Sequence, residues 1–288
     1  MAQTKREIEA LLAAAGTQPK HRFGQNFMID QNLVRLVADA GEVATGDWII
    51  EVGPGTGTLT EELIARGGRI IAVEIDRDLA AALRSRFASV DAFQLIEGDA
   101  LESKHRVNSK LLEVIEQARQ ADSAARVKLV ANLPYNIASP LVIELLLAGV
   151  ELLAFTVQKE VADRLRARAA EEAYGPLSVV AQLLGDVQVV RTLPPQAFWP
   201  APKIESSLVK IVRTDHESVA SIDRRAMGEF VHAVFSYRRK TLRKALAEAG
   251  HDAAAILGAT GLDGQQRPEQ FTPLQFAAMF AAANQPPI

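Results

Sequence analysis

Short apolar runs alternate with amphipathic segments along the first 213 residues of this 288-residue chain. The apolar runs predict buried strands at residues 48–52, 69–74, 92–96, 127–131, 152–157, 187–192 and 207–212. Segments with apolar positions at helical spacing predict helices at residues 8–15, 31–40, 58–66, 78–87, 111–120, 140–147 and 160–172. Strands that alternate with helices are typical of an α/β fold, so we expect a mostly parallel, doubly wound sheet.

The pattern changes towards the end of the chain. No long helix is predicted between the last two strands, so they can pair antiparallel at one edge of the sheet. Residues 214–288 show only helical periodicity, interrupted by turns at glycine and proline. The sequence therefore predicts an α/β domain at residues 1–213 and a small all-helical domain at residues 214–288.

Composition and charge narrow the classes of function. The chain is 48% hydrophobic and 23% charged, which is ordinary for a globular protein. It contains no cysteine, which excludes disulfides, iron–sulfur clusters and thiol nucleophiles, and its five histidines show no metal-ligand spacing, so we expect no metal. The net charge of −3 gives no overall attraction to nucleic acid, so any RNA contact must come from local clusters.

The sequence predicts neither a signal peptide nor a membrane-spanning segment. The first seven residues lack the apolar core of a signal peptide. The most apolar stretch, residues 141–155, is interrupted by Glu144 and Glu151 and is too short to span a bilayer. We therefore expect a cytoplasmic protein without membrane contact.

Three consecutive predicted strands end in residues suited to a nucleoside. The first is followed by the glycine-rich turn 51–57, where Gly53 and Gly55 allow the backbone to approach a ligand closely. Glu74 ends the second strand and can accept hydrogen bonds from ribose hydroxyls, and Asp99 follows the third and can accept from an adenine amino group. Taken singly, these are a tight turn and two helix caps or solvated acids. Together at one sheet edge, they favour an adenosine-containing ligand.

A further motif, Asn132-Leu133-Pro134-Tyr135, follows the fourth predicted strand. In this motif the chain resembles the S-adenosylmethionine-dependent adenine-N6 methyltransferases, and with its continuation to Leu141 it resembles the ribosomal RNA adenine dimethyltransferases. Other segments that match this family are residues 20–27, 157–162, 174–179, 198–206 and 235–242. The likeness is greatest to the housekeeping enzyme that dimethylates two adjacent adenosines near the 3′ end of small-subunit (16S) rRNA.

The resemblance implies a Rossmann-like class I methyltransferase fold with S-adenosylmethionine as the cofactor. It implies that residues 1–213 bind this cofactor and carry out catalysis, and that the helical residues 214–288 bind RNA. The implied cofactor-binding residues are Asn26, Met28, Gly53, Gly55, Glu74, Asp99 and Asn132. Two departures from the family pattern are Met28, where leucine is common, and the long spacer between Asp99 and Asn132.

The motif residues suit methyl transfer to an exocyclic amine, whose lone pair is delocalised into the adenine ring. If the Asn132 side-chain oxygen and the backbone carbonyl of Leu133 or Pro134 accept the two N–H bonds, the nitrogen can pyramidalise and attack in line. Tyr135 stacks on the target base in this interpretation, with Phe198 as a second aromatic wall. The simpler interpretations are a strand-ending turn for Asn132–Tyr135 and a core position for Phe198.

Basic residues that could bind RNA gather in two places. We call Arg238, Arg239, Lys240, Arg243 and Lys244 the basic cluster. Their spacing predicts that they lie along neighbouring faces of one helix, where they can contact phosphates or form a solvated face. Lys20 and Arg22, in the basic loop 20–26, are further candidates. The expected partner is the small ribosomal subunit, bound by a monomer.

Three other functions stay open at this point. The first is an antibiotic-resistance methylase that acts on large-subunit rRNA and shares much of this motif set. The second is a non-catalytic ribosome-assembly or transcription factor on the same fold, although the intact turn at residues 51–57 and the motif at 132–135 argue against lost catalysis. The third is DNA adenine methylation, whose motif usually begins with Asp or with Asn-Pro-Pro.

Overall fold

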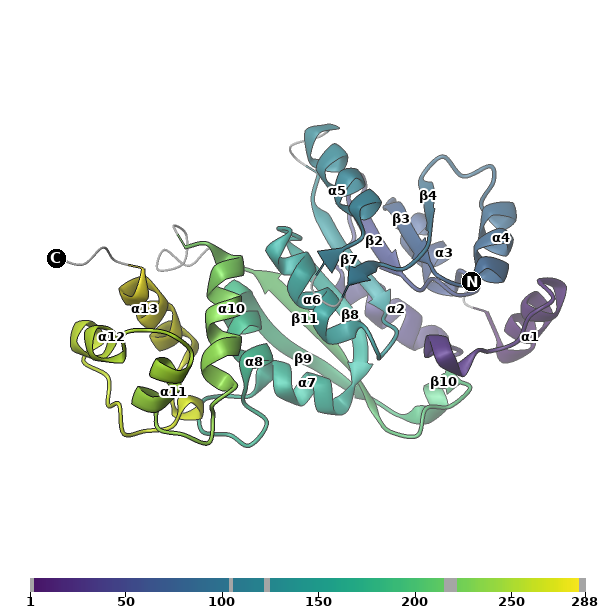
Figure 1. Cartoon of the computed structure of the whole chain (residues 1–288). Helices are drawn as coiled ribbons and strands as arrows, with labels where there is room; N and C mark the ends of the chain where they lie inside the picture. Colours follow the sequence, from purple (N-terminus) through teal and green to yellow (C-terminus); the bar gives the residue numbers. More distant parts are fainter. Residues whose placement is uncertain (1–2, 104–105, 122–124, 215–221, 285–288) are drawn as a thin grey trace. The chain divides into compact units, whose positions relative to one another are not determined.

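A computed structural model describes residues 3–103, 106–121, 125–214 and 222–284 of the chain (Figure 1). Its contacts divide the chain into two compact units. The first unit is Met1–Ala162 with Gln188–Val212, and the second is Asp163–Val187 with Arg213–Ile288. The second unit thus includes the segment 163–187, which the boundary expected after residue 213 assigns to the first domain. The roles of the two domains stay predictions.

The first unit is built on a seven-stranded sheet with the order β4-β3-β2-β7-β8-β11-β9. Its strands are β2 (Trp48–Val52), β3 (Arg69–Glu74), β4 (Phe93–Glu97), β7 (Val127–Asn132), β8 (Leu152–Gln158), β9 (Gly185–Leu193) and β11 (Ser206–Arg213). The pairs from β4 to β8 are parallel, and β11 runs antiparallel to β8. The predicted mostly parallel sheet is confirmed. The strand order reverses between β2 and β7, and open α/β sheets bind ligands at such a point.

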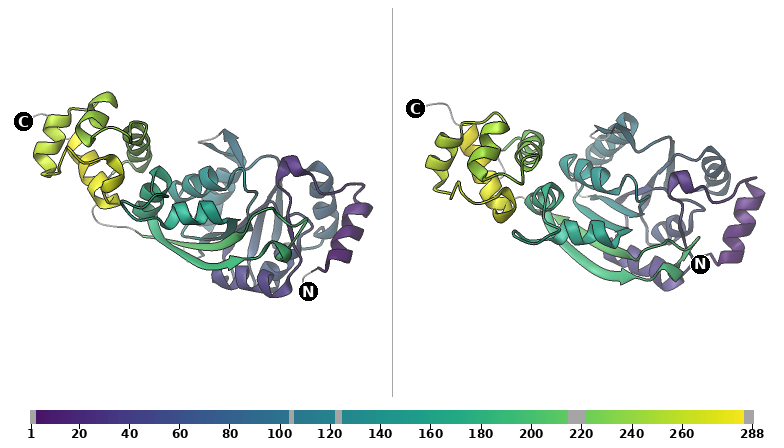
Figure 2. Two further views of the ribbon diagram at one scale, coloured as in Figure 1. Left: turned by 90° about the horizontal axis from the view of Figure 1, so that it is seen from below. Right: turned by 60° about the horizontal axis from the view of Figure 1, so that its bottom comes forward.

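Helices cover both faces of this sheet (Figure 2). The helix α2 (Gln31–Ala40) precedes the first strand of the sheet, and α3 (Thr58–Ala65), α4 (Arg77–Arg86), α5 (Ser109–Ala121) and α6 (Ala138–Leu147) lie between its later strands. Val37 of α2 and Leu63 of α3 pack in one core cluster with Ile49 of β2. Ile50 points to the opposite face of the same strand and is also fully buried. A sheet buried on both faces explains why its strands read as continuous apolar runs.

Several short elements have no periodic signal in the sequence. They are β1 (Phe27–Met28), β5 (Leu101–Ser103), β6 (Arg106–Val107), β10 (Phe198–Trp199) and 3₁₀ turns at His21–Phe23 and Pro195–Ala197. The helix predicted at residues 8–15 is confirmed as α1 (Lys5–Ala14). β1 pairs antiparallel with β10, with Met28 opposite Phe198. This two-residue ladder fixes the basic loop to a segment about 170 positions away in the sequence.

The predicted helix 160–172 is wrong in its second half. The helix α7 (Lys159–Arg166) ends early, and Ala170 has φ of 71°, a left-handed conformation that cannot continue a helix. A second helix, α8 (Pro176–Leu184), was missed. It begins with proline at its first position, which is favourable there, but its nearly unbroken apolar run carries no helical periodicity.

Apart from the ends of β9 and β11 that it contains, the regular structure in the described residues of the second unit is helical. Beside α8, its helices are α10 (Arg224–Phe235), α11 (Leu242–Glu248), α12 (Ala253–Thr260), α13 (Pro273–Ala283) and a 3₁₀ turn at Pro268–Gln270. Phe235 and Phe276 stack with ring centroids 5.2 Å apart, and the Tyr174 hydroxyl donates a hydrogen bond of 2.8 Å to the carbonyl of Phe271. Within the described part of the chain, no helix is long and apolar enough to cross a membrane.

Candidate active site

A cavity that is partly open to solvent lies where β2, β3, β4 and β7 end, at the point where the strand order reverses. We call it the strand-end cavity, and its place at the carboxyl ends of parallel strands is typical of ligand sites in α/β sheets. The predicted site residues that line it are Asn26, Met28, Gly53, Gly55, Glu74, Asp99, Asn132 and Pro134. The structure therefore brings together all seven predicted cofactor-binding residues. Tyr135, Phe198, Lys20 and Arg22 are not among the lining residues.

The turn after β2 requires glycine at two positions. Gly53 and Gly55 have φ of 71° and 61°, which glycine adopts without strain. A Cβ on Gly55 would lie 2.8 Å from the Phe27 ring, and one on Gly53 would lie 3.2 Å from the ring of Pro134. The turn thus lets loop 20–28 and the Asn132–Tyr135 motif approach the same backbone from two sides.

The carboxyl of Glu74 lies in the wall of the strand-end cavity and is 3% exposed. One oxygen accepts a hydrogen bond of 2.9 Å from the backbone N–H of Asp76, and the other accepts one of 3.3 Å from that of Gly55. Burial raises the pKa of Glu74 to about 7, although these N–H groups act in the opposite direction. Glu74 therefore titrates near neutral pH and holds the glycine-rich turn in place.

A second buried acid, Glu51, was not predicted as a site residue. It lies on β2, lines the cavity and is 2% exposed, and its carboxyl accepts a hydrogen bond of 2.7 Å from the hydroxyl of Thr60. Burial raises the pKa of Glu51 to about 8. The available signal was an acid within an apolar strand, directly before a glycine-rich turn.

The side-chain amide of Asn132 is held from two sides at the end of β7. Its N–H donates a hydrogen bond of 2.6 Å to the carbonyl of Asn26, and its oxygen accepts one from the hydroxyl of Thr156. Thr156 is fully buried and lies directly opposite Asn132 on β8. Because an amide oxygen has two lone pairs, the Asn132 oxygen keeps one for a ligand. Thr156 was missed, since nothing in its local sequence marks it.

The two predicted stacking residues differ in their surroundings. Tyr135 is partly exposed, and its hydroxyl lies 2.6 Å from that of Ser206. Phe198 is 2% exposed and packs in the core cluster with Leu33 and Leu208. The structure thus places the Phe198 ring at a core position, and Phe198 does not line the strand-end cavity.

The remaining cofactor candidates lie at the rim and floor of the cavity. Asp99 is exposed and accepts a hydrogen bond of 3.0 Å from the backbone N–H of Leu101. The Asn26 amide donates a hydrogen bond of 3.1 Å to the carbonyl of Gly24, and Met28 is 4% exposed. Asp99 uses one carboxylate oxygen for this bond, and Asn26 stabilises the loop 20–28 through its bond to Gly24.

The basic cluster does not lie on one helix, which corrects the expectation from its spacing. Its first three members follow α10 in a turn, and Arg243 and Lys244 lie in the first turn of α11. The extended backbone of Thr241, with ψ of 154°, separates the two groups. All five side chains are exposed, and Lys240 forms an ion pair of 2.6 Å with Glu248.

Among the described residues, no group of three or more His, Asp and Glu could hold a metal ion.

Comparison with known proteins gives the family. Residues 16–285 match the family of the ribosomal RNA adenine dimethylases. The chain belongs to this family. It is 41% identical to ribosomal RNA small subunit methyltransferase A of Magnetococcus marinus, over 97% of this chain and 96% of that one. The protein of the same name from Deinococcus radiodurans is 40% identical, over 96% and 89% of the two chains. The predicted family and the prediction of a methyltransferase are confirmed.

Solved structures show the same fold as this adenine dimethylase family member. A dimethyladenosine transferase from Plasmodium falciparum has a TM-score of 0.70 at 20% identity, and covers 88% of this chain and 96% of its own. The 23S rRNA methyltransferase ErmE has a TM-score of 0.61 at 21% identity, over 90% and 100% of the two chains. The predicted class I methyltransferase fold is confirmed.

Proposed function

We propose that this adenine dimethylase transfers methyl groups from S-adenosylmethionine to N6 of two adjacent adenosines near the 3′ end of 16S rRNA, giving N6,N6-dimethyladenosine. The observation that carries the proposal is the Asn132 amide, which is fixed from two sides and opens onto the same cavity as Glu74 and the glycine-rich turn. Relatives about 40% identical over nearly the whole chain are named small-subunit methyltransferases.

The side chains that line the strand-end cavity fit the proposed cofactor. Glu74 would accept hydrogen bonds from the ribose hydroxyls, and Asp99 would accept one from the adenine amino group. Glu74, when it is ionised, would favour a cation within the cavity over a neutral analogue. S-adenosylmethionine, when bound, supplies an electrophilic methyl group on its sulfonium.

The residues of the Asn132–Tyr135 motif would perform catalysis through positioning. The free lone pair of the Asn132 oxygen accepts one N6–H, and the backbone carbonyl of Leu133 or Pro134 accepts the other. The target nitrogen then directs its lone pair towards the methyl group. The new N–C bond would form as the bond between the methyl group and the sulfonium sulfur breaks, and S-adenosylhomocysteine would leave as the neutral thioether. The amine proton becomes acidic in this step and leaves to water, so no strong general base is needed.

Two further groups complete the proposal. Tyr135, anchored through Ser206, stacks on the target base, while the core position of Phe198 favours a role in supporting Met28 through the β1–β10 pairing. The basic cluster binds rRNA phosphates, which are the usual anchors for exposed Arg and Lys. Arg22 is a further phosphate candidate, since its side chain is exposed.

The test is methylation of separated ribosomal subunits that lack the modification, with methyl-labelled S-adenosylmethionine. We expect label in the small subunit only, at two adjacent adenosines, and labelling that is slower by about 10²–10³-fold with Asn132→Ala. Label in the large subunit would replace the proposal with the resistance-methylase alternative. Subunit binding by wild type without methylation of either subunit would favour the assembly factor.

A further inference from the structure

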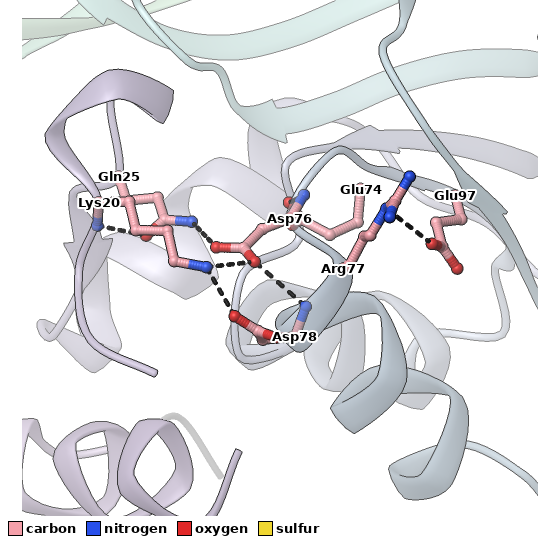
Figure 3. Close-up of polar contacts among 7 residues, drawn as sticks. All are labelled: Lys20, Gln25, Glu74, Asp76, Arg77, Asp78 and Glu97. Carbon is pink, nitrogen blue, oxygen red and sulfur yellow. Dashed lines mark hydrogen bonds and ion pairs between the residues drawn. The ribbon is translucent and has the colours of Figure 1, made fainter. Parts of the chain in front are cut away.

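Lys20, expected to contact RNA, has its ammonium group between two carboxylates (Figure 3). Its Nζ lies 2.8 Å from an oxygen of Asp76 and 2.7 Å from one of Asp78. The Asp76 side chain is 1% exposed and that of Lys20 is 25% exposed. These hydrogen bonds raise the pKa of Lys20, so the ammonium stays charged.

Gln25 closes the same network. Its side-chain N–H donates a hydrogen bond of 3.0 Å to the second oxygen of Asp76, and its side-chain oxygen accepts one of 2.8 Å from the backbone N–H of Lys20. Both oxygens of Asp76 are therefore held by loop 20–28. We call Lys20, Gln25, Asp76 and Asp78 the Lys20 network.

The Lys20 network connects directly to the strand-end cavity. Residues Phe23–Met28 form one of its walls. On the other side, the backbone N–H of Asp76 donates to the carboxyl of Glu74, which in turn accepts from Gly55. The wall also reaches the catalytic motif, because the carbonyl of Asn26 accepts a hydrogen bond from the Asn132 amide.

We propose that Lys20 is a positioning residue for the cofactor, which fixes loop 20–28 against the end of β3 and so closes the strand-end cavity, and not a phosphate contact. The proposal rests on the proposed use of S-adenosylmethionine. To reach a phosphate, the ammonium would have to leave Asp76 as a buried carboxylate without its cation, which is strongly unfavourable. Arg22, two residues away, carries no such cost, because its guanidinium is exposed and lies over the Phe23 ring at 4.6 Å.

The test compares Lys20→Met, Lys20→Arg and the matched control Arg22→Met in the full chain. Calorimetric titration with S-adenosylmethionine should show a Kd raised about tenfold for Lys20→Met, since charge-assisted hydrogen bonds that order the wall are lost. Lys20→Arg should recover most of the affinity for S-adenosylmethionine. Arg22→Met should bind S-adenosylmethionine with the wild-type Kd. In turnover, Lys20→Met should raise KM for the cofactor and leave kcat within about threefold of wild type.

The salt dependence of RNA binding distinguishes a positioning role of Lys20 from a phosphate contact. With saturating S-adenosylhomocysteine, Lys20→Met should keep the wild-type salt dependence, whereas a lost phosphate contact lowers the log–log slope by about 0.7–0.9. Wild-type cofactor affinity in Lys20→Met would overturn the proposal, whether or not the RNA slope changes.

Two measurements keep this test independent of folding and of the proposed function. A thermal melt shows whether Lys20→Met folds. If it does not fold, Gln25→Met is the second variant, because it removes an uncharged side chain of the Lys20 network. It should raise the Kd for S-adenosylmethionine by about two- to fivefold. Hydrogen exchange without cofactor should show faster exchange at residues 23–28 in these variants, and unchanged exchange would overturn the proposal. Absence of S-adenosylmethionine binding by wild type would instead refute the proposed function.

Discussion

The strand-end cavity of the first unit and the basic cluster of the second unit handle charge in opposite ways. In the cavity, Glu51 and Glu74 are buried and hydrogen-bonded, and burial raises both pKa values, to about 8 and about 7. In the basic cluster, all five cations are exposed, and Lys240 is paired with Glu248. The cavity therefore has hydrogen-bonded polar groups in a low dielectric, and the basic cluster has charges that are exposed to water.

This difference predicts two kinds of recognition. Fixed, desolvated groups discriminate by geometry, because a misplaced ligand leaves them without a partner. Exposed cations contribute mainly through counterion release, which depends on salt and little on precise geometry. We expect the cavity to select one nucleoside and its methyl donor, and the basic cluster to supply affinity for a large RNA.

The largest effect should come from Asn132→Ala, which removes the amide that accepts the target N–H. Single-turnover methylation should fall about 10²–10³-fold, as when one aligned transition-state hydrogen bond is lost. Cofactor affinity by calorimetry should stay within a few-fold of wild type. A wild-type rate in this variant would show that the fixed geometry of the cavity does not activate the amine.

Replacement of Arg238, Arg239 and Arg243 together by Ala should weaken RNA binding more than about tenfold at low salt. Three lost phosphate contacts lower the log–log salt slope by about 2–3. Lys240→Ala alone is the graded control, with a smaller change, because Glu248 already offsets its charge. Binding across a salt series checks both variants, and parallel slopes for the triple variant and wild type would make the basic cluster a solvated face.

Glu74→Gln should lower cofactor affinity about tenfold at pH 8, because an ionised carboxylate accepts ribose hydroxyls more strongly than an amide does. The pKa of Glu74 is raised to about 7, so wild-type affinity should increase as pH rises through 7 and the carboxylate forms. The variant should lose this part of the pH dependence. Titrations at pH 6, 7 and 8 measure it, and identical profiles would remove Glu74 from the binding site.

The smallest effect should come from Thr156→Val, which removes the hydroxyl that orients Asn132 and keeps the volume nearly unchanged. We expect kcat to fall about three- to tenfold, in line with one neutral hydrogen bond, with the cofactor Kd unchanged. Thr156→Ser should restore the rate. A wild-type kcat in Thr156→Val would mean that the Asn26 carbonyl alone fixes the Asn132 amide.

The sequence by itself determined most of the secondary structure and where its chemistry lies. Buried strands such as Trp48–Val52 and Arg69–Glu74 are mostly apolar, and acids or turn formers lie at or directly after their ends. Because parallel strands end at one edge, this local pattern was enough to bring Gly53, Glu74 and Asn132 to one cavity. The motif 132–135 then identified the family.

Only the tertiary structure decided how these residues are held and which cations are already paired. Lys20 meets Asp76 across 56 positions, Asn132 meets Asn26 across 106, and Thr156 meets Asn132 between neighbouring strands. A lysine in a basic loop has the same local signature whether it contacts a phosphate or a buried carboxylate. The difference lies in long-range packing, which sets burial and the dielectric around each charge, and no local periodicity records it.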